Sequence, residues 1–215
     1  KEKTLLTDMG STKSYICHKI KKEFPQIDFI GGHPMTGREV SGPENALANL
    51  FTGMTYILID HKEEGYQKDD ELNPKKELLL NLLNKLGSNV IFMDPEVHDE
   101  IVALTSHLPH FIAISLINRI IRFEGKYPHL NKMMGQGFMD FTRIAACSPD
   151  MWKDIFITNR KYVLTQVNNI IDEMTFFRDV IENGNEEKIN EILQDVQKKR
   201  LLLNEDFKKV ISNEI

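Results

Sequence analysis

The chain has 215 residues, of which 41% are hydrophobic, and its 27 Lys and Arg against 32 Asp and Glu give a formal net charge of −5. The acidic balance argues against a nucleic-acid-binding protein, the two widely spaced cysteines argue against a disulfide-stabilised secreted domain, and no apolar run approaches the roughly 18–20 residues of a membrane span. We therefore expect a cytoplasmic protein of one large or two small domains, with no nucleic-acid or membrane partner.

Short apolar runs alternate with helical periodicity in the first half of the chain. The expected strands cover residues 4–8, 28–30, 55–60 and 89–93. Helices are expected after Ser11, which is placed to cap the first of them, and from Pro74 to Gly87. This alternation predicts a parallel sheet covered on both faces. Because the chain starts at Lys1 without methionine and is strand-like almost at once, we expect it to be part of a longer protein.

The second half of the chain is predicted to be helical. Residues 96–123 have helical periodicity, with Pro109 expected to kink or reset the helix. Two long helices with apolar stripes are expected, from Pro149 to Gly184 without a break and then over residues 189–210. One small domain cannot cover both stripes, so we expect a dimerisation domain and a homodimer, with an intramolecular hairpin as the alternative.

The fold class expected from these patterns is α/β followed by all-α. Residues 1–94 would form part of a Rossmann-like domain, and residues 95–215 a helical domain for substrate binding and dimerisation.

Two polar segments directly follow expected strands, where open parallel sheets bind ligands. In residues 8–13, Ser11 could be a simple helix cap, but Lys13 opposes the helix dipole and so suggests a function. In residues 31–39, two glycines allow a close backbone approach and Pro34 stiffens the residue after His33. His33 is thus a catalytic candidate, with an ordinary loop histidine as the alternative.

Three histidines lie close together in the sequence, at His98, His107 and His110. Their spacing matches no standard zinc ligand set, and no cysteine pair or His-Glu-x-x-His helix accompanies them, so we expect no metal. An imidazole that hydrogen-bonds a substrate is the functional interpretation, and a buried structural histidine is the alternative.

A fourth segment, residues 135–143, places Arg143 near two glycines and two aromatic residues. A guanidinium in this setting suits a bidentate contact with a carboxylate. The alternative is a surface ion pair between Asp140 and Arg143, three residues apart.

Taken in order, the motifs resemble those of the prephenate dehydrogenase family. They are Asp8-x-Gly-Ser-x-Lys13, Gly32-His33-Pro34-Met35-x-Gly37, Ser106-His107-Leu108-Pro109-His110, Gly137-Phe138-x-Asp-Phe-Thr-Arg143 and Pro149-x-Met151-Trp152-x-Asp154-Ile155. The resemblance covers nearly the whole chain. Family members begin with a Gly-x-Gly-x-x-Gly fingerprint that is absent from this sequence, so the chain would hold the later part of the nucleotide domain and the helical domain.

The resemblance implies oxidative decarboxylation of prephenate to 4-hydroxyphenylpyruvate with NAD or NADP as hydride acceptor. His33 would accept the proton of the ring hydroxyl, and Ser11 would orient it. Ser11, Gly32 and Pro34 would also lie beside the cofactor. The choice between NAD and NADP depends on residues outside this sequence.

The resemblance further implies a pocket for a substrate with two carboxylates. The residues expected to bind the substrate are Arg143, His110, Lys13, Gly137, Trp152, His98 and His107. Glu39 and Asp140 match acidic positions that could gate access. Thr36 and Arg38 depart from the commoner Ala-Gly-Thr-Glu form of the histidine loop, which leaves the charge at the pocket mouth open.

Two other functions stay open from the sequence. Arogenate dehydrogenase would perform the same chemistry on an amino-acid side chain, although a donor at His110 favours the keto acid prephenate. A helical dimerisation fragment without activity is the alternative from another class.

Overall fold

The structure is a computed structural model that describes residues 4–37, 42–59, 74–123 and 125–212. The chain divides into two compact units, residues 1–166 and residues 167–215. The domain boundary expected near residue 94 lies inside the first unit and stays a prediction.

Among the described residues of the first unit, five short strands form two small sheets. Strand β1 (Leu5–Thr7) pairs in parallel with β2 (Asp28–Ile30), and β4 (Thr55–Ile59) pairs in parallel with β5 (Asn89–Met93). Strand β3 (Gly32–Pro34) joins the second sheet antiparallel to β4. The parallel pairing expected from the sequence is confirmed, and β3 is an addition to it.

Strand β3 changes the interpretation of the histidine segment. Instead of turning away into a loop after Gly31, the chain continues into β3, with His33 opposite Ile57 of β4. A Cβ atom on Gly32 would lie 2.7 Å from the main-chain oxygen of Asp8 and 3.0 Å from the ring of Tyr56. The close approach that Gly32 permits is therefore to the protein's own backbone and core.

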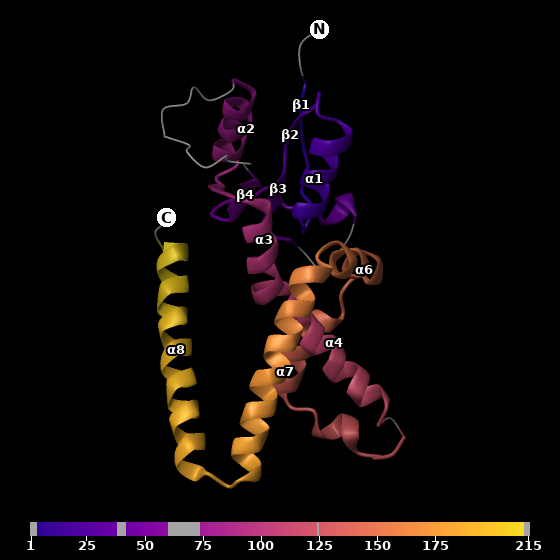
Figure 1. Cartoon of the computed structure of the whole chain (residues 1–215), viewed down its shortest axis with the longest axis vertical. Helices are drawn as coiled ribbons and strands as arrows, with labels where there is room; N and C mark the ends of the chain where they lie inside the picture. The colour runs from indigo at the N-terminus through magenta and orange to yellow at the C-terminus, as the bar shows by residue number, and fades with distance from the viewer. Residues whose placement is uncertain (1–3, 38–41, 60–73, 124, 213–215) are drawn as a thin grey trace. The chain divides into compact units, whose positions relative to one another are not determined.

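Helices cover both faces of the three-stranded sheet (Figure 1). Alternate side chains of β4 point to opposite faces, as a strand requires. Tyr56 and Leu58 pack against buried leucines of α2 (Pro74–Lys85). Ile57 and Ile59 pack against Cys17 of α1 (Ser14–Glu23). These two clusters confirm the expected α/β arrangement.

The helical run that follows β5 contains three segments: α3 (Pro95–Val102), the π-helical turn η2 (Ala103–His107) and α4 (Leu108–Ile121). Pro109 has no N–H to donate, and the helix resets its hydrogen bonds through the π-helical turn directly before it.

With 27 residues, Pro95–Ile121 is long and apolar enough to cross a membrane, so the expectation that no run reaches this length is wrong. The run also carries His98, Asp99 and His107, which are buried and hydrogen-bonded to other parts of the first unit. Of the apolar window in this run, 28% is buried inside the structure.

Shorter helices and two long ones complete the chain. The short helices are η1 (Pro43–Asn45), η3 (Leu130–Met133), α5 (Gln136–Thr142), η4 (Arg143–Ala145) and α6 (Pro149–Thr158). The helix expected to continue to Gly184 breaks at Asn159, and α7 (Arg160–Glu182) begins after it. Gly184, with a φ of +60°, makes the turn into α8 (Glu186–Ser212).

Candidate active site

The Asp8 carboxylate stabilises the turn after β1. It accepts hydrogen bonds from the main-chain N–H of Gly10 and of Gly32, both at 3.0 Å, and it forms an ion pair with Lys13. The Lys13 ammonium also donates to the carbonyl oxygen of Gly32 at 2.7 Å. This ammonium is fully buried and engaged with both partners, so Lys13 holds β1, β3 and α1 together. Its expected contact with the substrate stays a prediction.

The N-terminus of α1 is capped by a residue from a different helix. Both oxygens of the Asp99 carboxylate accept main-chain N–H groups at the helix start, from Lys13 at 2.7 Å and from Ser14 at 2.9 Å. The prediction that Ser11 caps this helix is wrong, since the N-cap residue is Lys13 and makes no side-chain cap bond. Asp99 satisfies the exposed donors in its place.

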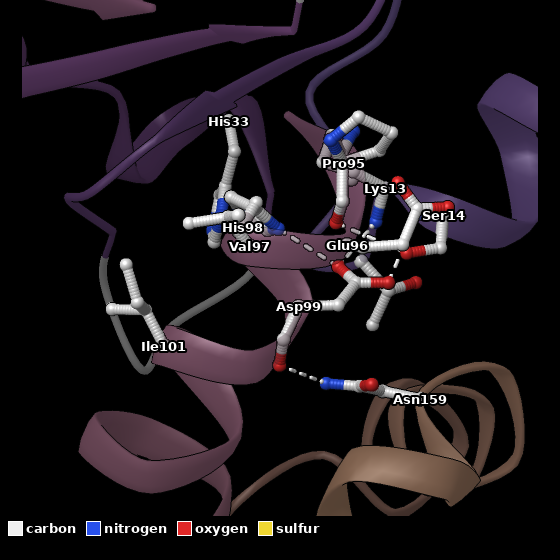
Figure 2. A network of polar contacts seen from close by, with 12 residues as sticks. Lys13, Ser14, His33, Pro95, Glu96, Val97, His98, Asp99, Ile101 and Asn159 are labelled. Atoms are coloured by element: carbon white, nitrogen blue, oxygen red, sulfur yellow. Dashed lines mark hydrogen bonds and ion pairs between the residues drawn. The ribbon is translucent and has the colours of Figure 1, made fainter. Parts of the chain in front are cut away.

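A chain of hydrogen bonds runs from Asp99 to His33 (Figure 2). Nδ1 of His98 lies 2.8 Å from Oδ1 of Asp99. Nε2 of the same imidazole lies 2.8 Å from Nδ1 of His33. His98 and Asp99 are at most 1% exposed. His33 of β3 is thus linked through α3 to the start of α1.

The surroundings of Asp99 and His33, the two ends of this series of hydrogen bonds, determine their charges. Burial alone would raise the pKa of Asp99, but hydrogen bonds from His98, Lys13 and Ser14 hold that pKa below its usual value. Burial first, and next the neighbouring His98 and Lys13 side chains, lower the pKa of His33 from 6.5 to about 3. At neutral pH Asp99 is therefore ionised and His33 is neutral, so His33 can accept a proton.

A second buried network fixes His107. The Asn159 amide nitrogen donates to the carbonyl oxygen of Asp99 at 2.8 Å and lies 3.1 Å from Nδ1 of His107. Since an N–H faces Nδ1, the neutral His107 carries its proton on Nε2 and is a donor there. Burial lowers the pKa of His107 to about 4, with Asp99 acting against this shift and the neighbouring His98 and His110 side chains adding to it.

Trp152 of α6 packs against two of these histidines. Its ring stacks on His110 with centroids 3.7 Å apart, and it meets the His107 ring edge-on at 5.8 Å. Nδ1 of His110 lies 2.9 Å from the carbonyl oxygen of Ser106, so it carries the proton. The buried indole of Trp152, the buried imidazole of His107 and the partly buried imidazole of His110 form one aromatic wall.

A cavity of about 490 Å³ lies between the ends of the β1 and β3 segments and the helices α4 and α6. It is lined by Met9, Ser11, His33, Pro34, Met35, Thr36, Gly37, Ser106, His107, His110, Arg143, Ile144, Ala146, Cys147, Ser148, Met151, Trp152 and Ile155. Seven residues expected to form the site are in this lining: Ser11, His33, Pro34, His107, His110, Arg143 and Trp152. The structure thus brings the imidazole of His33 and the guanidinium of Arg143 to a common cavity.

Other expected site residues lie outside the lining of this cavity. His98 is behind His33, and Lys13 and Gly32 are buried in the β1–α1–β3 junction. Gly137 and Asp140 are exposed on α5, where the Asp140 carboxylate accepts from the Gln136 side chain at 2.7 Å. Glu39 and Arg38 lie outside the described residues.

Asn159 and the hydrogen-bonding role of Asp99 were not predicted from the sequence. A signal for Asn159 existed, because it stands four residues from the buried Ile155 and four from the buried Val163 on one helical stripe. Among the residues that the structure describes, no three His, Cys, Asp or Glu side chains are grouped to hold a metal ion.

Comparisons with known proteins identify the family to which the chain is similar. Residues 1–91 match the family model "Prephenate dehydrogenase, nucleotide-binding domain", and residues 94–195 match "Prephenate dehydrogenase, dimerization domain". The prephenate dehydrogenase of Bacillus subtilis is 34% identical over 186 residues, which cover 86% of this chain and 48% of the relative. The cyclohexadienyl dehydrogenase of Zymomonas mobilis is 30% identical, over 96% of this chain and 68% of the relative.

Solved structures give the same relationship. A crystal structure of prephenate dehydrogenase from A. aeolicus, in complex with hydroxyphenyl propionate and NAD+, is 33% identical with a TM-score of 0.80 and covers 93% of this chain and 67% of its own. An arogenate dehydrogenase structure from Synechocystis, at 24% identity and a TM-score of 0.74 over 92% of this chain and 68% of its own, shares the fold. The chain spans about half the length of the first curated relatives it matches, at 48% and 44%.

Proposed function

Because the chain belongs to the prephenate dehydrogenase family, we propose that it takes part in the oxidative decarboxylation of prephenate to 4-hydroxyphenylpyruvate, with NAD+ or NADP+ as hydride acceptor, in tyrosine biosynthesis. The observation that carries this proposal is the cavity lined by both His33 and Arg143. One side chain can take a proton from the substrate, and the other can hold a carboxylate.

His33 acts on the ring hydroxyl of the substrate. When hydride leaves the carbon that bears this hydroxyl, the oxygen becomes a carbonyl and must lose its proton. A neutral His33 lining the cavity accepts that proton, which prevents positive charge from building up on the oxygen. His33 returns the proton in the next step.

Loss of carbon dioxide completes the reaction. The bond between the ring and its carboxylate breaks, and its electron pair enters the ring, which becomes aromatic. The ring oxygen takes back the proton held by His33 and becomes a phenol. The balance is one hydride to the cofactor and one carbon dioxide released, and aromatisation supplies the driving force.

The lining offers a place for a nicotinamide ring on the sheet side. Met9 and Pro34 present apolar surface there, and Ser11 presents a hydroxyl group. When bound, the nicotinamide supplies the acceptor for the hydride. The A. aeolicus relative was solved with NAD+, which supports a nicotinamide dinucleotide for this family member.

The helical side of the cavity holds the two carboxylates of the substrate. Arg143 pairs with one of them, and the Nε2–H of His107 is a neutral donor for a substrate oxygen. The wall formed by Trp152 and His110 gives the ring an apolar surface and excludes water.

The state of His110 keeps arogenate as a second candidate substrate. Its Nδ1–H is directed to the Ser106 carbonyl, so a neutral His110 is an acceptor at Nε2. An acceptor suits the ammonium group of arogenate, and only a protonated His110 would donate to a keto acid. His110 therefore does not favour prephenate by itself, contrary to the expectation from the sequence.

The test is to follow the NADH absorbance band with prephenate and with arogenate, in protein expressed from the whole coding sequence. We expect NADH formation with a higher kcat/KM for prephenate. A higher kcat/KM for arogenate would transfer the function to that substrate. Absence of reduced cofactor with either substrate, when NAD+ and NADP+ are each supplied, would overturn the proposal.

We further propose a homodimer in the cytoplasm. The match to a dimerisation domain and the exposed apolar side chains of α7 and α8, such as Met174, Val196 and Phe207, support the dimer. Both cysteines are free, Cys17 and Cys147, which fits a reducing compartment.

A further inference from the structure

His98 has the geometry of a residue that acts through its neighbour. Its side chain is fully buried and does not line the cavity, yet both ring nitrogens are hydrogen-bonded, one to Asp99 and one to His33 (Figure 2). We propose that His98 and Asp99 are positioning residues that hold His33 in the tautomer with its proton on Nδ1, leaving the lone pair of Nε2 for the substrate. The catalytic consequence rests on the proposed function, and the tautomer does not.

The tautomer of His33 follows from the donors and acceptors along the series of hydrogen bonds that starts at Asp99. Its carboxylate receives two main-chain N–H groups, from Lys13 and Ser14, and these groups can only donate. An ionised carboxylate can only accept, so the Nδ1 of His98 that lies 2.8 Å away must carry a proton. The Nε2 of a neutral His98 is then an acceptor.

The same rule applies at the next contact. Nε2 of His98 and Nδ1 of His33 are 2.8 Å apart, so one of them must donate. Because His98 is the acceptor, the proton is on Nδ1 of His33. Nε2 of His33 is then unprotonated on a ring that lines the cavity.

The arrangement is rigid as well as polarised. Asp99 is fixed by the start of α1 through two main-chain donors, and its own carbonyl oxygen accepts from Asn159. His98 and Asp99 are neighbours on the buried face of α3. A single orientation of His98, and hence of His33, follows from these contacts.

In the proposed reaction, this tautomer allows His33 to accept the hydroxyl proton of the substrate. The hydroxyl proton of the substrate moves to Nε2 of His33, and the ring becomes an imidazolium whose Nδ1–H stays hydrogen-bonded to His98. The buried negative charge of Asp99, two hydrogen bonds away, stabilises this cation. With the proton on Nε2 instead, His33 would offer the hydroxyl group a donor and could not take its proton.

The direct test is nitrogen NMR of the protein labelled with ¹⁵N-histidine, near neutral pH. Couplings from the ring carbon-bound protons distinguish a protonated from an unprotonated ring nitrogen, and the His33 signals are assigned by their loss in His33→Gln. We expect His33 with a protonated Nδ1 and an unprotonated Nε2. A protonated Nε2, or rapid averaging of both tautomers, would overturn the inference.

Variants at His98 connect the tautomer to its cause. In His98→Leu the acceptor for the His33 proton is lost, and the Nδ1–H form of His33 should no longer dominate the spectrum. In His98→Gln an amide oxygen can still accept, so more of that form should remain. His18→Gln, which removes an exposed histidine on α1, should leave the His33 signals unchanged. Unchanged His33 signals in His98→Leu would show that His98 does not set the tautomer.

Kinetics of the same variants separate positioning from a loss of binding. For protein expressed from the whole coding sequence, we expect His98→Leu to lower kcat for prephenate by about 10-fold to 10⁴-fold with little change in KM. His98→Gln should retain more of kcat. A wild-type protein with no NADH formation would contradict the proposed function alone, whereas an active enzyme with a protonated Nε2 on His33 would contradict this inference alone.

Discussion

Arg143 is the residue on which the proposed binding of the substrate depends. It begins η4 at the end of α5 and lines the cavity that also contains His33. We expect Arg143→Gln to raise KM for prephenate by the equivalent of about 2–5 kcal/mol, because an anionic group of the substrate loses its charged partner. The matched control is Arg178→Gln, which removes an exposed arginine of α7 paired with Asp179. Equal KM values for both variants would remove Arg143 from the site.

The two neutral histidines also predict how stability depends on pH. The pKa values of His33 and His107, ordinarily 6.5, are about 3 and about 4 in the folded protein. Below about pH 6.5 the unfolded chain binds protons that the folded chain excludes, so the free energy of unfolding falls as pH is lowered. The slope for each group is at most about 1.4 kcal/mol per pH unit.

Urea unfolding at a series of pH values measures this slope. It should be steeper for the wild-type protein than for His33→Asn between about pH 6.5 and about pH 4.5. The same slope for both proteins would mean that His33 is not held neutral by the fold.

At the level of single residues, part of the site could be predicted from the sequence and part could not. His33, Ser11 and Arg143 follow strand ends or glycines, where functional side chains gather, and all three line the cavity. The position of Lys13 suggested a ligand, but the structure supplies Asp8 and a carbonyl oxygen as its partners. Asp8 belongs to the same sequence motif as Lys13, but the carbonyl oxygen is that of Gly32 in β3, and the local pattern around Lys13 carries no information about that contact.

Among the elements, the short strand β3 is the one that presents His33, and it depends on Gly32. A methyl group at this position would lie 2.7 Å from the carbonyl oxygen of Asp8. Because this oxygen belongs to the main chain, it cannot move away freely. We expect Gly32→Ala to lower the free energy of unfolding by about 1–3 kcal/mol.

Gly137→Ala is the control, because the residue is helical and, apart from its chain neighbours and its own helix backbone, no atom of the described residues lies within 4 Å of the added Cβ. That change should be neutral or stabilising by about 0.5–1 kcal/mol. Equal stability of Gly32→Ala and wild-type protein in chemical denaturation would contradict the packing argument.

The longer elements were predictable because apolar residues recur along them at regular spacing. The apolar run of β4 and the stripes of α7 and α8 carry their own periodicity. Strand β3 has the sequence Gly-His-Pro, which has little strand propensity and pairs only because β4 lies beside it. The break at Asn159 contains neither glycine nor proline and arises from the tertiary contacts of that side chain.

For the whole molecule, the exposed apolar side chains of α8 are the feature that a single chain leaves unexplained. Val196, Leu203 and Phe207 share one face of the helix and are 62%, 49% and 67% exposed. If this face joins two copies, Val196→Glu combined with Leu203→Glu should convert a dimer into monomers, because two charges would be buried in the interface. Light scattering after gel filtration measures the change in mass.

Gln194→Glu adds a single charge beside this face and should leave the dimer intact. A wild-type protein that is monomeric at all accessible concentrations would contradict the dimer, as would a double variant that keeps its mass.

The proton-acceptor role of His33 is tested most directly by the steady-state kinetics of His33→Asn with prephenate, in protein expressed from the whole coding sequence and with His18→Asn as the matched control. We expect kcat to fall by about 10²–10⁴-fold while KM stays within a few-fold, because only the transition state needs the proton acceptor. A kcat equal to that of the wild-type enzyme would contradict this role.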